Sequence, residues 1–142
     1  MNNDLITTTF AAYMKTSKTV NERIKKDISS YNLSTTEFYI LEVLFNHKKL
    51  TIQQICNKIY VMSGSMTYVI DKLETKGYLK RISCPNDRRV IHVSLTNEGE
   101  IFWEEIAQKY ETIMKEMFGN LKEYELHTLK GLLESIEENA RN

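Results

Sequence analysis

The segment CPNDRRV, residues 84–90, places two adjacent arginines after an aspartate and the only proline of the chain. Proline and asparagine are typical turn residues, and Asp87 can form an ion pair that holds one arginine while the other projects. A projecting guanidinium suits the narrow, strongly negative minor groove of A·T-rich DNA. The residues do not decide whether Arg88 or Arg89 projects, and a solvated surface turn is the alternative interpretation.

A second polar segment, MSGSMTY at residues 62–68, combines small hydroxyl side chains with a glycine just before a predicted helix. Hydroxyls donate to and accept from base edges and phosphates, and glycine removes a side chain where the chain must turn. Helix capping is the alternative role for the two serines. The candidate DNA-contacting residues are Thr51, Gln53, Ser63, Gly64, Ser65, Met66, Thr67, Tyr68, Lys72, Asp87, Arg88 and Arg89.

Apolar residues recur at helical spacing in three segments that precede these candidates, which predicts three helices. The first covers roughly residues 4–30. The second, preceded by Ser34 and Glu37 at the spacing of a capping box, ends near residue 46. The third is short and follows a second capping box, formed by Thr51 and Gln54.

A fourth helix is predicted in the segment SMTYVIDKLETKG, residues 65–77, with Met66, Val69, Ile70 and Leu73 on one face and Gly77 at its C-terminal cap. Residues 78–82 and 90–95 alternate in polarity and predict two strands joined as a hairpin. Two further helices follow, over about residues 97–118 and 122–139. This order is typical of a mainly α, α+β winged helix-turn-helix, in which the later helix enters the major groove.

The charge distribution supports a site for a polyanion in the middle of the chain. The 142 residues carry no net charge, yet residues 48–96 contain nine basic and three acidic side chains, a net charge of +6, and residues 97–142 carry −6. The length favours a single domain. No apolar run approaches the roughly 18 residues of a membrane span, and no signal peptide is evident. With only two cysteines, we expect a reduced, cytoplasmic setting.

The segments SGSMTYVIDKLETKGYLKR and DRRVIHVSLTNEG resemble the multiple-antibiotic-resistance regulator (MarR) family of bacterial transcription factors, and the resemblance extends over nearly the whole chain. The stretch from TTEFYILEVL to DRRV is also similar to the subgroup that regulates hydroquinone and catechol resistance. The resemblance implies a homodimer built from residues 1–30 and 97–142, around a winged helix-turn-helix at 31–96. It also implies a pseudo-palindromic operator and a repressor that a small phenolic compound or an oxidant releases.

The apolar residues support a dimer independently of the resemblance. One winged unit of 142 residues needs less apolar helix surface than the first and last helices offer, so a second subunit is expected to cover the excess. The predicted stripes on the last two helices are Ile101, Phe102, Ile106, Tyr110, Ile113, Met114 and Met117, followed by Leu126, Leu129, Leu132, Leu133 and Ile136.

Aromatic side chains near the predicted dimer helices are candidates for binding an effector, because they can stack on a phenol or quinone ring. Aromatic residues at helical spacing also occur simply as core residues, which is the alternative role. The candidates are Phe10, Tyr13, Met14, Phe38, Tyr39 and Trp103.

Cysteine oxidation is a second possible switch. Cys56 falls on the predicted buried stripe of the third helix and is expected to be inert. Cys84 lies near Arg81, Arg88 and Arg89 in the sequence, which favours an exposed thiol of lowered pKa, although a structural or incidental cysteine is the alternative. Residues 1–30 contain no cysteine, whereas peroxide-sensing members of the family carry one near the start of the first helix.

An enzyme is not expected from this sequence. His47, His92 and His127 lie on three separate elements, and neither cysteine has a partner at metal-ligand spacing. The sequence has no glycine-rich phosphate loop and no nucleophile motif, so no cofactor is expected. The remaining alternative to DNA binding is a winged-helix module that contacts only other proteins.

Overall fold

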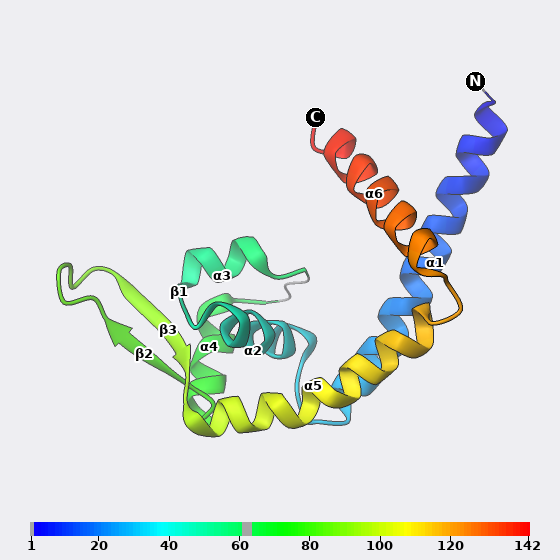
Figure 1. Ribbon diagram of the computed structural model, residues 1–142. Helices are drawn as coiled ribbons and strands as arrows, with labels where there is room; N and C mark the ends of the chain where they lie inside the picture. Colours follow the sequence, from blue (N-terminus) through cyan, green and yellow to red (C-terminus); the bar gives the residue numbers. More distant parts are fainter. Residues whose placement is uncertain (1, 61–63) are drawn as a thin grey trace. The chain divides into compact units, whose positions relative to one another are not determined.

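The computed structural model describes residues 2–60 and 64–142, which form two compact units divided between Tyr110 and Glu111. The elements in chain order are α1 (Asn3–Ser29), α2 (Thr35–His47), β1 (Lys49–Thr51), α3 (Ile52–Lys58), α4 (Met66–Thr75), β2 (Leu79–Ser83), β3 (Ile91–Leu95), α5 (Asn97–Phe118) and α6 (Glu123–Ala140) (Figure 1). The division falls within α5, and the two units are treated separately below.

Local side-chain hydrogen bonds define where the helices begin. The Ser34 hydroxyl accepts from the Glu37 amide at 3.1 Å, and the Glu37 carboxylate accepts from the Ser34 amide at 3.0 Å. Thr51 and Gln54 make the same reciprocal pair at the start of α3. Both predicted capping boxes are therefore present, and each satisfies amides that the first helical turn leaves free.

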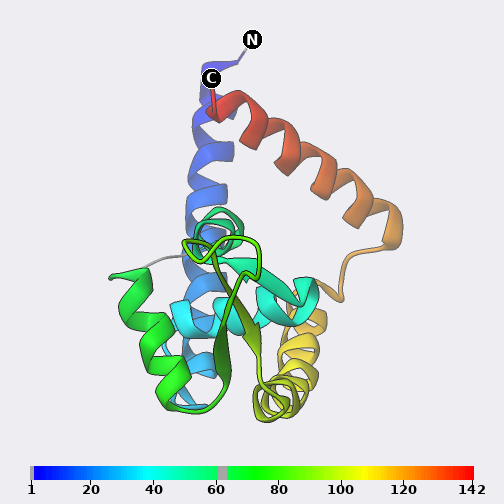
Figure 2. The ribbon, with the colours of Figure 1, turned by 90° about the vertical axis from the view of Figure 1, so that its left-hand side faces the viewer.

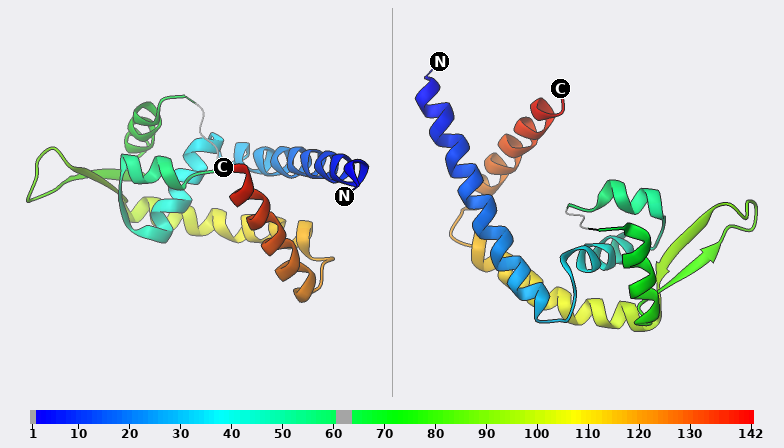
Figure 3. Two further views of the ribbon diagram at one scale, coloured as in Figure 1. Left: turned by 90° about the horizontal axis from the view of Figure 1, so that it is seen from above. Right: turned by 180° about the vertical axis from the view of Figure 1, so that it is seen from behind.

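A three-stranded antiparallel sheet with the order β1-β3-β2 lies in the first unit. The predicted hairpin of β2 and β3 is confirmed, with Arg81 opposite Val93, and it extends beyond the helices of this unit (Figures 1 and 3). The additional strand β1, in which Leu50 pairs with Val93, was not expected from the sequence. A strand of three residues, whose last residue Thr51 is also the cap of α3, is too short to show an alternating pattern.

Helix α2 lies at the centre of the core of the first unit and contacts α1, α3, α4 and the sheet. The predicted apolar face of α4, formed by Met66, Val69, Ile70 and Leu73, is buried against this core. Gly77 follows α4 with a φ of +85°, as its predicted place in the C-terminal cap requires. The expected fold class, a mainly α winged helix-turn-helix with helices at both termini, is confirmed.

Long helical surfaces at both ends of the chain remain exposed. Residues 2–16, which include the first half of α1, are all exposed, and so are large apolar side chains such as Phe10, at 61%. In the second unit, α6 has no buried residue, and Leu132 and Ile136 are more than half exposed. Within the described residues, the helices are too short or too polar to span a bilayer.

Candidate nucleic-acid interface

The N-terminus of α4 presents a small polar surface. Gly64, Ser65, Thr67 and Tyr68 are all exposed, and the Ser65 hydroxyl accepts from the Tyr68 amide at 3.5 Å as the helix cap. Gly64 has a φ of +77°, a conformation that favours glycine. Ser63 lies outside the described residues. Four of the predicted contact residues therefore share one accessible surface at the start of the helix.

Met66 differs from its neighbours on α4. Its side chain is only 8% exposed and packs with the apolar stripe of the helix, so it cannot reach a nucleic acid without unpacking the core. The prediction that Met66 contacts DNA is therefore restricted to its backbone amide, which lies in the first turn of the helix where amides can face a phosphate.

An ion-pair cluster fixes the C-terminal half of α4 to the start of α2. The buried Glu37 carboxylate lies 2.8 Å from the Lys76 ammonium and 3.6 Å from that of Lys72. Burial by itself would raise the pKa of Glu37, but hydrogen bonds from Lys76 and the Ser34 amide and the charges of both lysines lower it below its ordinary value. Lys72, predicted to contact DNA, is 47% exposed in its side chain and so remains accessible on one side.

Arg81 of β2 forms a second connection to α4 that the sequence did not reveal. Its guanidinium donates to Asp71 at 2.5 Å and to Glu74 at 2.7 Å. Both carboxylates lie on α4, so this fork joins the fourth helix to the hairpin directly. The ribbons of α4 and β2 lie close together in Figure 2. The spacing of Asp71 and Glu74 along one helix is the only sequence signal for such a pairing.

The turn between β2 and β3, which we call the wing turn (residues 84–90), is held by Asp87. Its Oδ1 accepts from the amide of Arg89 at 3.0 Å and from Nε at 3.2 Å. The hydrogen bonds from Arg89 lower the pKa of Asp87. The Arg89 side chain is nevertheless 91% exposed, and Arg88 is exposed without a side-chain partner in the described chain. The arginine that Asp87 holds is thus Arg89, but the pairing does not withdraw it from solvent, so both arginines project and not only the one that Asp87 leaves unpaired.

The two candidate DNA contacts at the start of α3, Thr51 and Gln53, differ in how accessible they are to an external partner. The Thr51 hydroxyl is half-buried and occupied as the helix cap, where it accepts from the Gln54 amide at 3.1 Å. Gln53 is exposed, and its amide donates weakly to Asn57, 3.5 Å away and one turn along the helix. Gln53 is therefore the more accessible of the two to an external partner.

Internal pairing reduces the charge that the basic middle segment offers to a partner. Lys72, Lys76, Arg81 and Arg89 all form ion pairs with carboxylates of the same unit. Within residues 2–60 and 64–142, the basic side chains of this segment that form no ion pair are Lys48, Lys49, Lys58, Lys80 and Arg88.

The six effector candidates do not form one site. Phe38, Tyr39 and Trp103 are buried together, with the Phe38 ring 5.0 Å from that of Trp103 and 5.4 Å from that of Tyr39. Phe10, Tyr13 and Met14 lie instead on the exposed first half of α1. For Phe38 and Trp103 the alternative interpretation as core residues holds, because their rings fill the space between α2 and α5.

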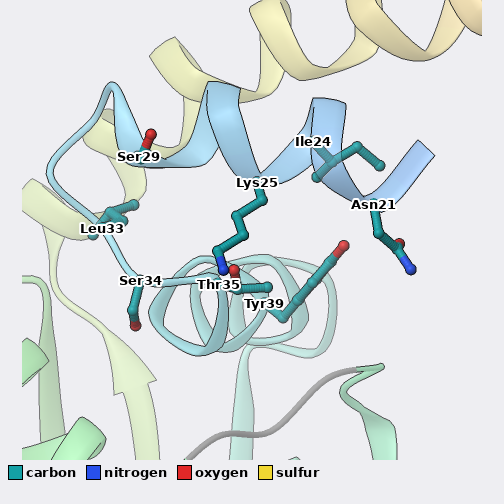
Figure 4. A pocket seen from close by; sticks show the side chains of 8 residues that line it. All are labelled: Asn21, Ile24, Lys25, Ser29, Leu33, Ser34, Thr35 and Tyr39. Atoms are coloured by element: carbon teal, nitrogen blue, oxygen red, sulfur yellow. The ribbon is translucent and has the colours of Figure 1, made fainter. Parts of the chain in front are cut away.

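A cavity of about 410 Å³ lies between the end of α1 and the start of α2, and we call it the α1–α2 cavity (Figure 4). Ile24 and Leu33 give it apolar walls, and the Lys25 side chain extends toward Thr35 at the start of α2. Tyr39 is the one effector candidate that lines it. The volume is within the range of small-molecule sites, and the lining combines apolar surface with a few polar groups.

Both cysteines are half-buried and free. Cys56 is less buried than its predicted place on the stripe of α3 required, since Ile55 is the only residue of that helix with no exposed surface. Cys84 begins the wing turn, and its amide donates to the Val90 carbonyl at 3.0 Å. Arg81, which was expected to act on its thiol, is bound instead to the carboxylates of α4.

Comparison with known proteins places these features in a family. The model of the MarR family matches residues 33–91, which span α2 to the start of β3. The HTH-type transcriptional regulator MhqR of Bacillus subtilis is 34% identical over 132 residues, covering 93% of this chain and 91% of the relative.

Two solved structures share the fold over almost the full length. AbsC, a MarR family regulator from Streptomyces coelicolor, superposes with a TM-score of 0.87 at 18% identity, covering 99% of this chain and 97% of AbsC. A mutant of MarR from E. coli, in complex with operator DNA, superposes with a TM-score of 0.75 at 25% identity, covering 94% of this chain and 96% of that protein. The chain therefore belongs to the MarR family of DNA-binding transcriptional regulators and is not an enzyme.

Proposed function

We propose that the protein is a homodimeric repressor that binds a pseudo-palindromic operator and is released by a small phenolic or quinone-like effector. The observation that carries this proposal is that the exposed N-terminus of α4 and the wing turn are held in a fixed relation to each other. The polar N-terminus of α4 is exposed while its apolar face is buried, and Arg81 ties this helix to the strand that leads into the wing turn. A recognition helix and a minor-groove contact need such a fixed relation.

In this proposal α4 enters the major groove. Ser65, Thr67 and Tyr68 contribute hydroxyls that can read base edges or bind phosphates, and Gly64 allows the backbone to approach closely. The exposed face of Lys72 supplies a phosphate contact, although its interaction with Glu37 moderates its charge. Gln53 adds a polar contact from the start of α3.

The wing turn supplies the minor-groove contact. Asp87 holds Arg89 in a defined orientation, yet its guanidinium remains almost fully exposed, so less side-chain entropy is lost when it inserts. Arg89 is therefore proposed to enter the narrow minor groove of A·T-rich DNA. Arg88, which has no such restraint in the described chain, is proposed to bind an adjacent phosphate.

The exposed apolar faces of α1 and α6 are proposed to form the dimer interface. Leu5, Phe10 and Tyr13 on α1 and Leu132 and Ile136 on α6 expose more apolar surface than isolated positions on a stable monomer. A twofold dimer would cover these residues and present two α4 helices to successive turns of one DNA face. Repression through an operator is supported by similarity to the E. coli MarR mutant solved with operator DNA.

The α1–α2 cavity is proposed as the effector site. Tyr39 can stack on an aromatic ring, and Lys25 can pair with a phenolate or carboxylate. The resemblance of the sequence to regulators of hydroquinone and catechol resistance supports a phenol or quinone. Phe10, Tyr13, Met14, Phe38 and Trp103 are not part of this site in the isolated chain.

Contacts that begin at the cavity provide a route to the DNA surface. Ser34 lines the cavity and caps α2 through Glu37, and the same carboxylate binds Lys76 and Lys72 of α4. A ligand that displaces Ser34 would disturb the Glu37 carboxylate and hence the position of α4. The effector and the operator would then favour different positions of this helix, which is the requirement for allosteric release.

The test is to select genomic fragments that the purified protein binds and to measure affinity for the recovered sequence by fluorescence anisotropy. We expect a sequence-specific complex with two protein chains per operator, and weaker binding after addition of a catechol or hydroquinone. Lys25→Met should preserve operator affinity but reduce release. Binding to duplexes of all sequences with equal affinity, or no binding at low salt, would favour the module that contacts only proteins.

A further inference from the structure

A second cavity, of about 260 Å³, lies between α2 and the residues that end α3, and we call it the α2–α3 cavity. Tyr39 forms part of its wall as well as part of the α1–α2 cavity, but the remaining residues of the two cavities differ. Glu42 and Tyr60 line the second cavity and not the first. Nothing in the proposed recognition of DNA or of a phenolic effector uses these two side chains.

Glu42 is a carboxylate that has no counter-ion among the residues that the structure describes. It is half-buried, and within residues 2–60 and 64–142 it forms neither an ion pair nor a hydrogen bond through its side chain. Burial raises its pKa, and its charge in turn raises the pKa values of Tyr39 and Tyr110, so it lies close to both hydroxyls. A half-buried carboxylate is hydrated less well than an exposed one, and a bound cation would compensate it.

Two aromatic rings adjoin this carboxylate. The Tyr39 and Tyr60 rings meet at 87° with 5.4 Å between their centroids, and both line the cavity. Perpendicular aromatic walls beside a negative charge are the arrangement that proteins use to recognise quaternary ammonium groups, which are attracted to the negative faces of the rings. Tyr60 is 78% exposed, which leaves much of its ring surface available to a ligand.

The charged and titratable groups around Glu42 are compatible with a cation. Tyr39 and Tyr110 are neutral at physiological pH, since the ordinary tyrosine pKa of 10.0 is already well above it and burial raises both pKa values further. Lys58 and His47 also line the cavity, and a positive Lys58 would oppose a cation. Lys58 forms no ion pair with Glu42 within the described residues, however, and burial raises the pKa of Glu42.

We propose that the α2–α3 cavity binds a small organic cation, a compact alkylammonium group, with Glu42 as its counter-charge and Tyr39 and Tyr60 as aromatic walls. This site is distinct from the site proposed for the phenolic effector. It selects a cation, whereas the α1–α2 cavity would bind a phenol or phenolate, and it lies within the helix-turn-helix. The cavity volume excludes large polycyclic cations and admits a group of the size of trimethylammonium.

Choline and its uncharged isostere 3,3-dimethyl-1-butanol provide the test, because they have nearly the same shape and differ in charge. Binding to the full-length protein is measured by NMR titration, following backbone amides of α2 and α3. We expect choline to shift resonances around Glu42 saturably and the isostere to bind at least about tenfold more weakly. Equal affinity for the two compounds, or no saturable shift with choline, would overturn the proposal.

Variants assign the interaction to its residues. Glu42→Gln preserves shape and should reduce choline affinity about tenfold, whereas Tyr60→Leu should reduce it about two- to fivefold. Lys58→Gln should strengthen binding. Glu104→Gln, which removes the same charge from an exposed position of α5, is the matched control and should have no effect. If Glu42→Gln instead bound benzoate more tightly and left choline binding unchanged, the cavity would be an anion site and the proposal would fail.

Discussion

The Lys76 ammonium, at the end of α4, donates a hydrogen bond to the buried Glu37 carboxylate, in the first turn of α2, with 2.8 Å between Nζ and Oε2. The same ammonium donates to the Asn32 carbonyl at 3.1 Å. One lysine therefore fixes α4 both to the loop before α2 and to the first turn of α2. Because Glu37 also caps α2, one carboxylate both stabilises the start of α2 and holds the C-terminal end of α4.

Removing either partner of this pair should destabilise the protein. Glu37→Gln keeps the capping box, since glutamine also serves at that position, but removes the charge that Lys76 and Lys72 compensate. Lys76→Met leaves the carboxylate buried without its nearest cation, and we expect a loss of about 2–3 kcal/mol in the free energy of unfolding by urea denaturation. The effect should stay below that of a fully enclosed pair because the Lys76 side chain is 24% exposed.

The contribution of Glu37 should also depend on pH with a defined sign. Its pKa in the folded protein is below the ordinary value of 4.5, so the carboxylate stabilises the fold above that value. This stability is lost as the pH falls through the lowered folded pKa, because the unfolded chain then binds the proton first. The difference in unfolding free energy between wild type and Glu37→Gln should shrink below about pH 4.5. A constant difference from pH 7 to pH 3 would contradict the ion pair.

The sequence alone was sufficient to predict the features that depend on interactions between residues close together in the chain. Ser34 and Glu37 are three residues apart, as are Thr51 and Gln54, so both capping boxes are visible without knowledge of the fold. The buried face of α4 and the wing strands follow from periodicity in the same way. The Asp87 and Arg89 pair is also local, but only the structure distinguishes Arg89 from Arg88 because the outcome depends on the backbone of the turn.

The contacts that fix α4 could not be predicted because their partners are distant in the chain. Lys76 and Glu37 are 39 residues apart, and nothing in either segment marks one as the partner of the other. The effector candidates show a second limit. Periodicity identifies an aromatic residue as buried, but it does not distinguish Phe38, which fills the core, from Tyr39, which borders two cavities. That distinction depends on packing between α1, α2 and α3.

The wing turn should show different effects for its two arginines. Arg88→Ala should weaken operator binding and reduce the slope of log affinity against log salt by about one, as expected for one phosphate contact. Arg89→Ala should also weaken binding and reduce the preference for A·T over G·C base pairs at the wing position. Anisotropy titrations on matched operators over a salt series measure both quantities.

Two further variants complete the test of the wing turn. Asp87→Ala should reduce the A·T preference without reducing affinity at low salt, because Arg89 loses its orientation while a negative charge is removed near DNA. Arg81→Met should leave the salt slope unchanged, since Arg81 is already paired with Asp71 and Glu74. The wing assignment fails if Arg88→Ala and Arg89→Ala both bind as tightly as the parent.

The dimer interface can be tested on α6. Leu133→Glu and Ile136→Glu each place a charge on the exposed apolar stripe and should convert the dimer to monomers in sedimentation experiments. Operator affinity should fall when dimerisation is lost, because a single subunit engages only a half-site. Ser135→Glu adds the same charge outside this stripe and should remain dimeric. A wild-type protein that sediments as a monomer at micromolar concentration would contradict the proposed assembly.

A Cys84 variant distinguishes between two ways of releasing the operator, which are effector binding in the α1–α2 cavity and modification of the Cys84 thiol. Its amide closes the wing turn through the Val90 carbonyl, and its half-buried thiol lies beside the proposed DNA contact, so modification there would disturb the turn directly. The α1–α2 cavity, by contrast, acts through Ser34 and Glu37 and needs no thiol. We therefore expect Cys84→Ser to bind the operator normally and to be released by catechol as readily as wild type. If the variant resists quinone and oxidant while Lys25→Met does not, release occurs through the thiol and not through the cavity.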